Sequence, residues 1–198
     1  MTGFAAYHRA VRGRPPRSTL VRAAAAAGRP GLAVDLGAGE GRDALPLLLA
    51  GWAVLAIDAD RAALARLRQS APAAGWLETR HAPFEVADWP CCDLVNASFS
   101  LFLCPPARLP ALLARIAARL RPGGRFAGQL LGPEDGWAGR PGIATVQRGE
   151  IAGLLPGMVI EHLVEEQGEA VTPRGRAKRW HLFHLVARRA AAAVAAGG

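Results

Sequence analysis

The sequence predicts a doubly wound α/β domain, in which helices cover both faces of a mostly parallel sheet. From Leu32 onward, apolar runs of strand length alternate with helical patterns, which is typical of βαβ units. A glycine-rich turn follows the first of these runs directly. The chain has 198 residues, 51% of them hydrophobic, which suffices for one domain whose core needs no disulfide or metal.

The elements of the first βαβ unit follow from local patterns. Residues 32–36 form an apolar strand that ends in the glycine-rich turn. The helical pattern at 43–50 stops at Gly51, a residue suited to end a helix. A second buried strand is predicted at 53–57, and Asp58 follows it directly.

Two amphipathic helices and two strands come next. Residues 61–69 place alanine and leucine at helical spacing with arginines toward solvent, and a short strand is predicted near 76–80. The apolar run 93–97 predicts a fourth strand. After a double-proline stop, residues 109–120 predict an amphipathic helix.

The last third of the chain is predicted to be rich in strands. The turn residues 121–124 end the preceding helix, and the polar connection 167–178 makes the final two strands a long-looped hairpin. In order, the predicted elements are a strand at 125–131, a turn-rich segment at 132–142, a short helix at 146–155, and strands at 158–166 and 179–187.

An N-terminal appendage and a tail flank this α/β unit. Residues 4–11 predict a short helix, a break rich in arginine and proline follows, and Ser18 is expected to cap a helix through Ala27. The tail is low in complexity, which is typical of fraying termini. The expected boundaries are 1–28 for the appendage, 29–189 for the main domain and 190–198 for the tail.

Composition and charge bear on partners and compartment. The net charge is +8, but only Lys178 of the 24 basic residues is lysine and no aromatic residues interleave with a basic patch. This balance favours a GC-rich coding bias over a nucleic-acid partner. The vicinal Cys91 and Cys92 favour a reducing interior. With neither a signal-peptide pattern nor an apolar run of membrane-spanning length, the sequence predicts a cytoplasmic protein without a membrane partner.

The glycine-rich turn predicts a ligand with an adenosine group. Gly37 and Gly39 let the backbone approach such a ligand closely. Asp58 lies about 20 residues further on, where a carboxylate binds both ribose hydroxyls. Arg42 stands where the dinucleotide fingerprint has its third glycine, which disfavours a nicotinamide-dependent oxidoreductase.

Two motifs give the sequence a family resemblance. Residues 34–43 resemble motif I of the class I S-adenosylmethionine-dependent methyltransferases, and residues 120–126 resemble the turn before their fifth strand. Over nearly its whole length, the chain is similar to bacterial methyltransferases of the tellurite-resistance type. The resemblance implies a seven-stranded Rossmann-like sheet with an antiparallel seventh strand. It also implies S-adenosylmethionine as cofactor and S-adenosylhomocysteine as product.

The resemblance also implies roles for cofactor-binding residues. Asp35 orients the loop or meets the methionine amino group, Asp58 binds the ribose, and Asn96 faces the methionine portion. Arg14 of the appendage is expected to pair with the cofactor carboxylate. The expected cofactor-binding residues are Asp35, Gly37, Ala38, Gly39, Asp58, Ala59, Ala82, Phe84, Asn96 and Arg14.

The adenine contacts depart from the family pattern. His81-Ala82 stands where the family usually carries an Asp that meets the adenine amino group. The backbone of Ala82, the ring edge of Phe84 and the backbone N–H of Ala59 are expected to contact the adenine instead. Ordinary core packing is an equally good interpretation of Phe84.

The acceptor side is expected to combine the appendage with the last loops. Tyr7 lines the pocket, Arg174, Arg176 and Lys178 surround its mouth, and His181, just inside the last strand, is the candidate catalytic residue. A solvated arm and a solvated hairpin tip are the alternatives. The expected substrate contacts are Tyr7, Phe99, Glu134, Trp137 and Arg176.

The predicted function is methyl transfer from S-adenosylmethionine to a small-molecule acceptor, for which an anionic compound is one candidate. A non-catalytic module that binds the cofactor or its product is an alternative from another class. Nucleic-acid methylation is a third, disfavoured because residues 96–99 lack the two prolines of base-modifying enzymes. His181 and His184 point to opposite faces of a strand, so no metal site is expected. The sequence predicts no particular oligomeric state.

Overall fold

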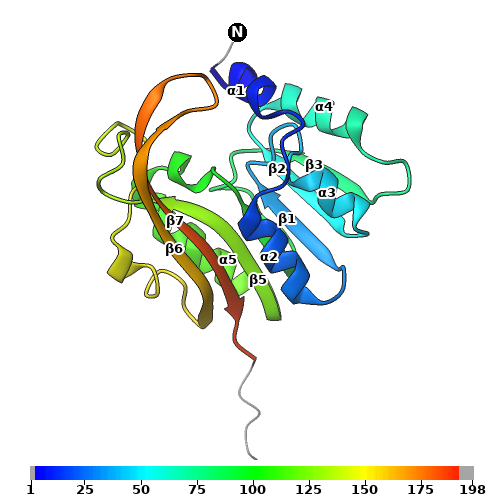
Figure 1. Ribbon diagram of the computed structural model, residues 1–198. Helices are drawn as coiled ribbons and strands as arrows, with labels where there is room; N and C mark the ends of the chain where they lie inside the picture. The colour runs from blue at the N-terminus through cyan, green and yellow to red at the C-terminus, as the bar shows by residue number, and fades with distance from the viewer. Residues whose placement is uncertain (1–2, 192–198) are drawn as a thin grey trace, which may run out of the picture.

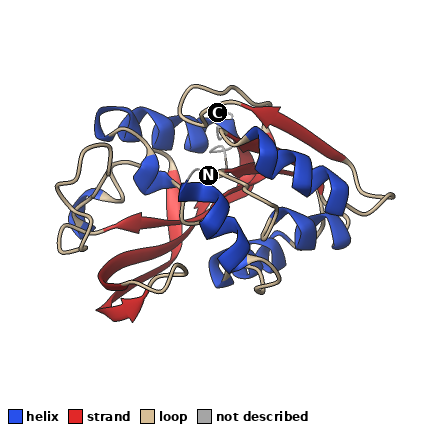
Figure 2. Ribbon diagram, turned by 90° about the horizontal axis from the view of Figure 1, so that it is seen from above, coloured by secondary structure: helices blue, strands red, loops and turns tan. Residues whose placement is uncertain are grey.

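The structure of the chain is a computed structural model that describes residues 3–191. Most of the expected tail, residues 192–198, lies outside the described part. Within residues 3–191, seven strands form one sheet with helices on both of its faces, as Figure 1 and Figure 2 show. The predicted α/β architecture is confirmed.

The sheet is mostly parallel. Its strands are β1 (Leu32–Leu36), β2 (Ala53–Asp58), β3 (Leu77–His81), β4 (Cys92–Ala97), β5 (Leu120–Leu131), β6 (Met158–Val171) and β7 (Ala177–Arg189). They lie in the order β3-β2-β1-β4-β5-β7-β6. The first five pair in parallel, and β7 lies antiparallel between β5 and β6. The expected antiparallel seventh strand is therefore present.

Helices bury both faces of the central strands. They are α1 (Gly3–Val11), α2 (Ser18–Ala27), α3 (Ala44–Leu49), α4 (Arg61–Ser70) and α5 (Leu109–Arg119). Ala33 and Val54 pack with α2, α3 and α4, whereas the neighbouring Val34 and Leu55 pack with α5 on the other face. A strand buried on both faces needs no polar alternation, which explains the continuous apolar runs. Within residues 3–191, no helix combines the length and the apolar character that a membrane crossing requires.

One predicted helix is wrong. Residues 146–155 form only the short 3₁₀ helix Arg148–Glu150 followed by turns. Ile151 and Leu155 are nevertheless buried in the main core, so their spacing reflects packing of an irregular segment. Gly149 and Gly153 stand inside the expected helix, where each glycine costs about 1 kcal/mol relative to alanine.

The last two strands are longer than predicted. β6 and β7 extend into the polar connection expected at 167–178, which leaves residues 172–176 as the turn. Strand pairing continues to Val171 and Ala177. The extended ribbon carries its tip beyond the edge of the sheet and toward α1, as Figure 1 shows in orange. Polar side chains had suggested a loop, but β6 is the exposed edge strand, where polar residues are common.

The start of α2 also differs from the expectation. Ser18 is the first helical residue rather than the cap, and the capping residue Arg17 contributes no side-chain hydrogen bond to the helix. The backbone N–H of Arg17 instead donates to Asp43 Oδ1 at 2.9 Å. The helix start is thus fixed by a residue distant in sequence.

Candidate functional site

A cavity of about 1690 Å³ opens at the carboxyl ends of the parallel strands, where ligands of open α/β sheets bind. The N-terminal segment, the turn after β1, the segment after β4 and the β6–β7 hairpin contribute its walls. The predicted site residues that line it are Tyr7, Arg14, Asp35, Gly37, Ala38, Gly39, Asp58, Ala59, Phe84, Phe99, Trp137 and Arg176. Outside its lining are Ala82, Asn96, Glu134 and His181.

The turn after β1 is tightly packed against its neighbours. The N–H groups of Gly37 and Ala38 both donate to the Ile57 carbonyl, at 2.8 and 3.2 Å. Gly37 has a φ of +76°, and a Cβ there would lie 2.5 Å from the Cβ of Ser100. Only glycine fits this position, so the backbone itself forms the cavity floor.

Asp58 is fixed at the end of β2 by two backbone donors. Its Oδ2 accepts the Gly39 N–H at 2.7 Å, and its Oδ1 accepts the Asp60 N–H at 2.7 Å. Each carboxylate oxygen has a second lone pair, and Asp58 lines the cavity. The carboxylate is therefore oriented and still able to accept two ligand hydroxyls.

A buried acidic cluster lies beside the turn. Asp35, Asp43 and Asn96 are 2%, 5% and 0% exposed. The Asn96 amide donates to Asp35 Oδ1 at 2.7 Å and to Asp43 Oδ2 at 3.3 Å. Asn96 thus holds the two acids and does not reach the cavity, which differs from its expected contact with the cofactor.

Asp35 has one oxygen that no group of residues 3–191 satisfies. Among the described residues, its buried Oδ2 has no hydrogen-bond partner. Burial, with the nearby Asp43 adding to it, raises the pKa of Asp35 to about 8. Because Asp35 lines the cavity, a cationic ligand group there would both satisfy this oxygen and favour the ionised carboxylate.

The N-terminal segment is tied to the turn by polar contacts. Arg12 and Arg66 both pair with Glu40, at 2.6 and 2.7 Å. Arg42 Nε donates to the Pro15 carbonyl at 2.8 Å, and its buried Nη1 has no partner among the described residues. Arg42 lines the cavity, a role that the sequence did not suggest beyond its departure from a glycine fingerprint.

Arg17 is a second arginine that the sequence did not indicate. Its guanidinium lies 3.8 Å from the centroid of the Phe99 ring and shares a side-chain hydrogen bond with Tyr7. Burial lowers the pKa of Arg17 from its ordinary value. Tyr7, Arg17 and Phe99 all line the cavity, so the arm and the segment after β4 meet there.

Four aromatic side chains form what we call the aromatic wall: Phe99, Phe102, Trp137 and Trp180. Ring centroids are 6.5 Å apart for Phe99 and Phe102, 5.8 Å for Phe102 and Trp137, 5.7 Å for Trp137 and Trp180, and 6.0 Å for Trp180 and Phe99. Edge and tilted contacts of this kind are favourable. The four rings therefore close a cycle on one side of the cavity.

Lys178 reaches this wall from β7. Its Nζ lies 3.5 Å from the Trp180 ring centroid and 4.4 Å from that of Trp137. It pairs with Asp135 at 2.6 Å, and the two residues are 6% and 4% exposed. Burial lowers the pKa of Lys178, and Asp135 opposes that shift. Lys178 therefore lines the cavity, as expected, but as a buried member of an ion pair and not as a solvated charge.

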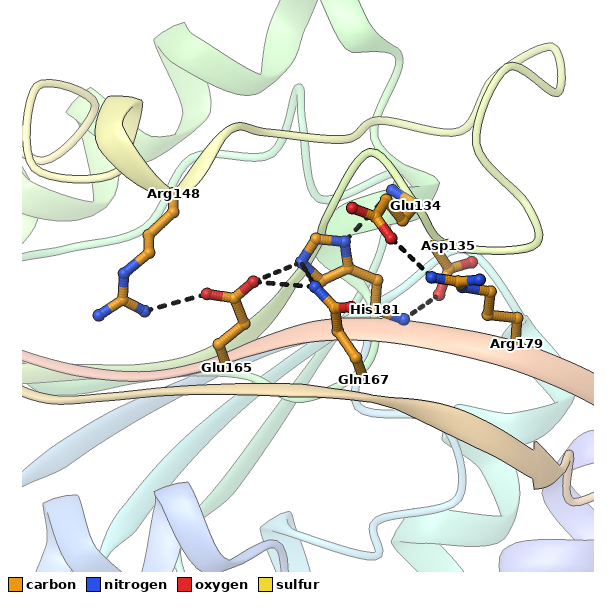
Figure 3. Close-up of polar contacts among 7 residues, drawn as sticks. All are labelled: Glu134, Asp135, Arg148, Glu165, Gln167, Arg179 and His181. Carbon is orange, nitrogen blue, oxygen red and sulfur yellow. Dashed lines mark hydrogen bonds and ion pairs between the residues drawn. The ribbon is translucent and has the colours of Figure 1, made fainter.

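The candidate catalytic residue His181 lies outside the cavity. Its Nδ1 accepts the Glu134 N–H at 3.2 Å, and its Nε2 contacts Glu165 at 3.0 Å, as Figure 3 shows. The ring covers Gly132, where a Cβ would lie 2.4 Å from it. Glu134 instead pairs with Arg179 at 2.6 Å. Neither His181 nor Glu134 is placed to meet an acceptor.

The expected adenine contacts are only partly assembled. Phe84 and Ala59 line the cavity, but the Ala82 N–H is used by the Asp58 carbonyl at 3.1 Å. His81 also lines the cavity, with Nε2 at 3.1 Å from the Ala59 carbonyl. The Ala82 N–H, which the sequence analysis assigned to the adenine, therefore donates to the backbone at the end of β2 instead.

Residues 33–124 match the family model described as a methyltransferase domain. This match covers a little under half of the chain and supports a domain of the class I methyltransferase type. The cofactor of this class is S-adenosylmethionine and the product is S-adenosylhomocysteine. Asp35 Oδ2, without a partner in the described part of the chain, and the glycine floor at Gly37 fit a ligand with a cationic amino group and a close-packed backbone contact. No curated protein sequence matches the chain significantly.

Solved structures share the fold of this methyltransferase domain. TehB from Haemophilus influenzae is 18% identical with a TM-score of 0.75, over 87% of this chain and 62% of TehB, so this chain spans less than two thirds of that protein. Magnesium protoporphyrin IX methyltransferase (ChlM) from Synechocystis PCC 6803, with bound S-adenosylhomocysteine, is 17% identical with a TM-score of 0.70, over 95% and 94%. The 1,6-didemethyltoxoflavin-N1-methyltransferase from Burkholderia thailandensis is 24% identical with a TM-score of 0.62, over 94% and 84%. The likeness to TehB agrees with the expected resemblance to the tellurite-resistance type.

Proposed function

We propose that this chain transfers the methyl group of S-adenosylmethionine to a small-molecule acceptor. The observation that carries the proposal concerns Asp35, which lines the same cavity as the oriented Asp58 carboxylate and whose buried Oδ2 has no partner within residues 3–191. Bound S-adenosylmethionine supplies a methyl group on a sulfonium sulfur. Methyl transfer needs alignment and exclusion of water more than a protein nucleophile.

The cavity offers a partner for each polar end of the cofactor. We assign the ribose hydroxyls to Asp58 and the α-ammonium group to Asp35 Oδ2. We assign the carboxylate to Arg42, whose buried Nη1 has no partner among the described residues, together with Arg14. Phe84 and Ala59 remain for the adenine. These residues come from separate elements and line the same cavity.

A small acceptor is supported by the enclosure of the site. The N-terminal segment and the hairpin tip both line the cavity, which leaves molecules of limited size room to reach the methyl group. Two proteins of the same fold are named for small-molecule acceptors, magnesium protoporphyrin IX and 1,6-didemethyltoxoflavin. A macromolecular acceptor would need a more open approach.

Calorimetric titration with S-adenosylhomocysteine tests the cofactor assignment. Asp58→Ala should weaken binding about 10-fold or more, because a charge-assisted hydrogen bond to the ribose is lost. Asp88→Asn removes an exposed acid outside the cavity and should leave affinity unchanged. Equal affinity of wild type and Asp58→Ala would contradict the assignment. NAD should give no binding heat, and production of S-adenosylhomocysteine with an acceptor panel separates an enzyme from a binding module.

A further inference from the structure

We propose that the aromatic wall and Lys178 form the acceptor site, and that the acceptor is a planar conjugated molecule with an anionic oxygen. The inference rests on the proposed function, because it places the acceptor beside the proposed cofactor site. The four rings, Lys178 and the glycine turn line one continuous cavity. Apolar rings supply the surface for a flat molecule, and the ammonium group supplies the charge for its acidic oxygen.

The aromatic wall is held in place rather than loosely packed. Phe99 has a φ of +55°, a backbone conformation that costs free energy for a residue with a side chain. The Phe99 N–H donates to Gln129 Oε1 at 3.0 Å, and the Gln129 amide donates to Thr19 at 2.9 Å. Gln129 and Thr19 are each 1% exposed. This buried chain fixes the direction of the Phe99 ring, which stands at the end of β4.

The chemistry of the wall favours a conjugated acceptor over an inorganic oxyanion. Phe102 and Trp180 are 5% and 8% exposed, and Phe99 and Trp137 are half-buried. A hydrated metalloid oxyanion has no apolar surface with which to cover such rings. A flat organic molecule covers them and gains both hydrophobic and ring contacts.

The charges beside the wall favour an anion. Lys178 has three N–H donors, and its only acidic partner among the described residues is Asp135. Both Asp135 oxygens also accept backbone N–H groups, from Trp137 at 2.9 Å and His181 at 3.0 Å. These bonds hold the carboxylate outside the cavity lining, which Lys178 reaches. Arg17 adds a second cation at Phe99.

The lysine also excludes a cationic acceptor. Lys178 Nζ occupies the position over Trp180 and Trp137 that a ligand cation would take in an aromatic cage. The acids that line this side of the cavity, Glu166 and Glu169, are exposed on β6, and Glu166 is paired with His184. A positive ligand would therefore meet like charge at the wall.

An anionic oxygen also balances the transfer step. The acceptor oxygen gives an electron pair to the methyl carbon as the carbon–sulfur bond breaks and its pair goes to sulfur. The negative charge of the oxygen and the positive charge of the sulfonium disappear together, and two uncharged centres result. Lys178 favours the ionised form of the acceptor before the step, so no protein base is required.

Fluorescence titrations of the full chain saturated with S-adenosylhomocysteine test this assignment. The probes are 1-hydroxy-2-naphthoate, the cation 2-naphthylmethylammonium and inorganic selenite. We expect the naphthoate to quench tryptophan fluorescence and to bind about 10-fold or more tightly than the ammonium probe, with selenite neither quenching nor competing. Binding of S-adenosylhomocysteine is measured first. If the chain does not bind it, the proposed function is contradicted, independently of the result with the acceptor probes.

Variants then assign the contacts. Lys178→Met with Asp135→Asn removes both charges and should weaken naphthoate binding about 10-fold while reducing the preference over the cation. Trp137→Leu, at a half-buried ring, should weaken both naphthyl probes alike. Arg119→Gln removes a charge outside the cavity and should change neither. Affinity for S-adenosylhomocysteine should stay within about threefold in all. The proposal would be overturned if neither the Lys178→Met/Asp135→Asn double variant nor Trp137→Leu changed naphthoate binding, or if selenite competed with the naphthoate.

Discussion

Asp35, which lines the cavity, and Asp135, which pairs with the cavity-lining Lys178, are both almost fully buried, and their oxygens are used differently. Asp135 pairs with Lys178 and also accepts two backbone N–H groups. Asp35 accepts one bond from Asn96, and its other oxygen has no partner among the described residues. The side proposed for the acceptor thus carries a completed ion pair, whereas the carboxylate on the side proposed for the cofactor lacks a charged partner among the described residues.

The two carboxylates differ in what compensates the cost of their burial. A buried carboxylate costs several kcal/mol unless charges and hydrogen bonds compensate. On the acceptor side, the compensation comes from the protein, so the wall exists before a ligand arrives. On the cofactor side, the raised pKa of Asp35 lets the acid stay protonated until a cationic group replaces the proton. Four experiments test this contrast.

Breaking the ion pair between Lys178 and Asp135 should have the largest effect on stability. Lys178→Met leaves Asp135 buried without its cation, and we expect the free energy of unfolding to fall by about 3–5 kcal/mol. Adding Asp135→Asn should recover part of that loss, because neither charge then remains, but the Asn NH2 group cannot accept the second of the two backbone N–H groups that the carboxylate accepts. Urea denaturation monitored by circular dichroism measures both. If the free energy of unfolding of Lys178→Met alone lies within about 1 kcal/mol of wild type, the ion pair does not form as a buried pair in solution.

Removing the Asp35 carboxylate should change how stability depends on pH and should weaken ligand binding. The folded-state pKa of Asp35, about 8, lies above its ordinary 3.8, so the folded protein holds a proton that the unfolded chain releases. The ligand-free protein should therefore lose stability as the pH rises through that window. Asp35→Asn should flatten this fall and weaken S-adenosylhomocysteine binding about 10-fold. Urea denaturation at several pH values and calorimetry check this, and an undiminished slope would contradict it.

The N-terminal arm should contribute less. Deleting residues 1–16 removes Tyr7, Arg14 and the Arg12–Glu40 pair, and we expect S-adenosylhomocysteine affinity to drop roughly 3- to 10-fold with faster proteolysis. Arg12→Gln alone should cost about threefold or less, because exposed ion pairs are weak. Arg9→Gln, outside the cavity lining, is the matched control. Intact affinity and protease protection after the deletion would rule out an arm that covers the cofactor.

The hairpin tip should have the smallest effect. Arg174 and Arg176 are exposed where they line the cavity, so replacing both by glutamine should lower turnover or binding of an anionic acceptor by about threefold or less. High salt should remove the difference, because it screens exposed charges. 1-Hydroxy-2-naphthoate and uncharged 2-naphthylmethanol are the matched probes. If both respond alike and salt has no influence, the tip does not select the acceptor.

Local patterns in the sequence predict the parallel core and the turn that follows its first strand. These depend on local rules: strands buried on both faces are continuously apolar, and a backbone with positive φ at Gly37 requires glycine. The position of Asp58 followed from the same logic, because the acid stands directly after a buried strand. The resemblance added the antiparallel seventh strand, which the sheet confirms.

Which polar side chains face the cavity depends on long-range packing. On β7, Lys178, Trp180 and Leu182 line the cavity while His181 points to the opposite face, because successive residues of a strand alternate. The sequence shows that alternation but not which face is which. Asp135 and Lys178 are 43 positions apart, and their pairing depends on the packing of the loop after β5 against β7. Such long-range partners are set by strand register and packing, which no local pattern encodes.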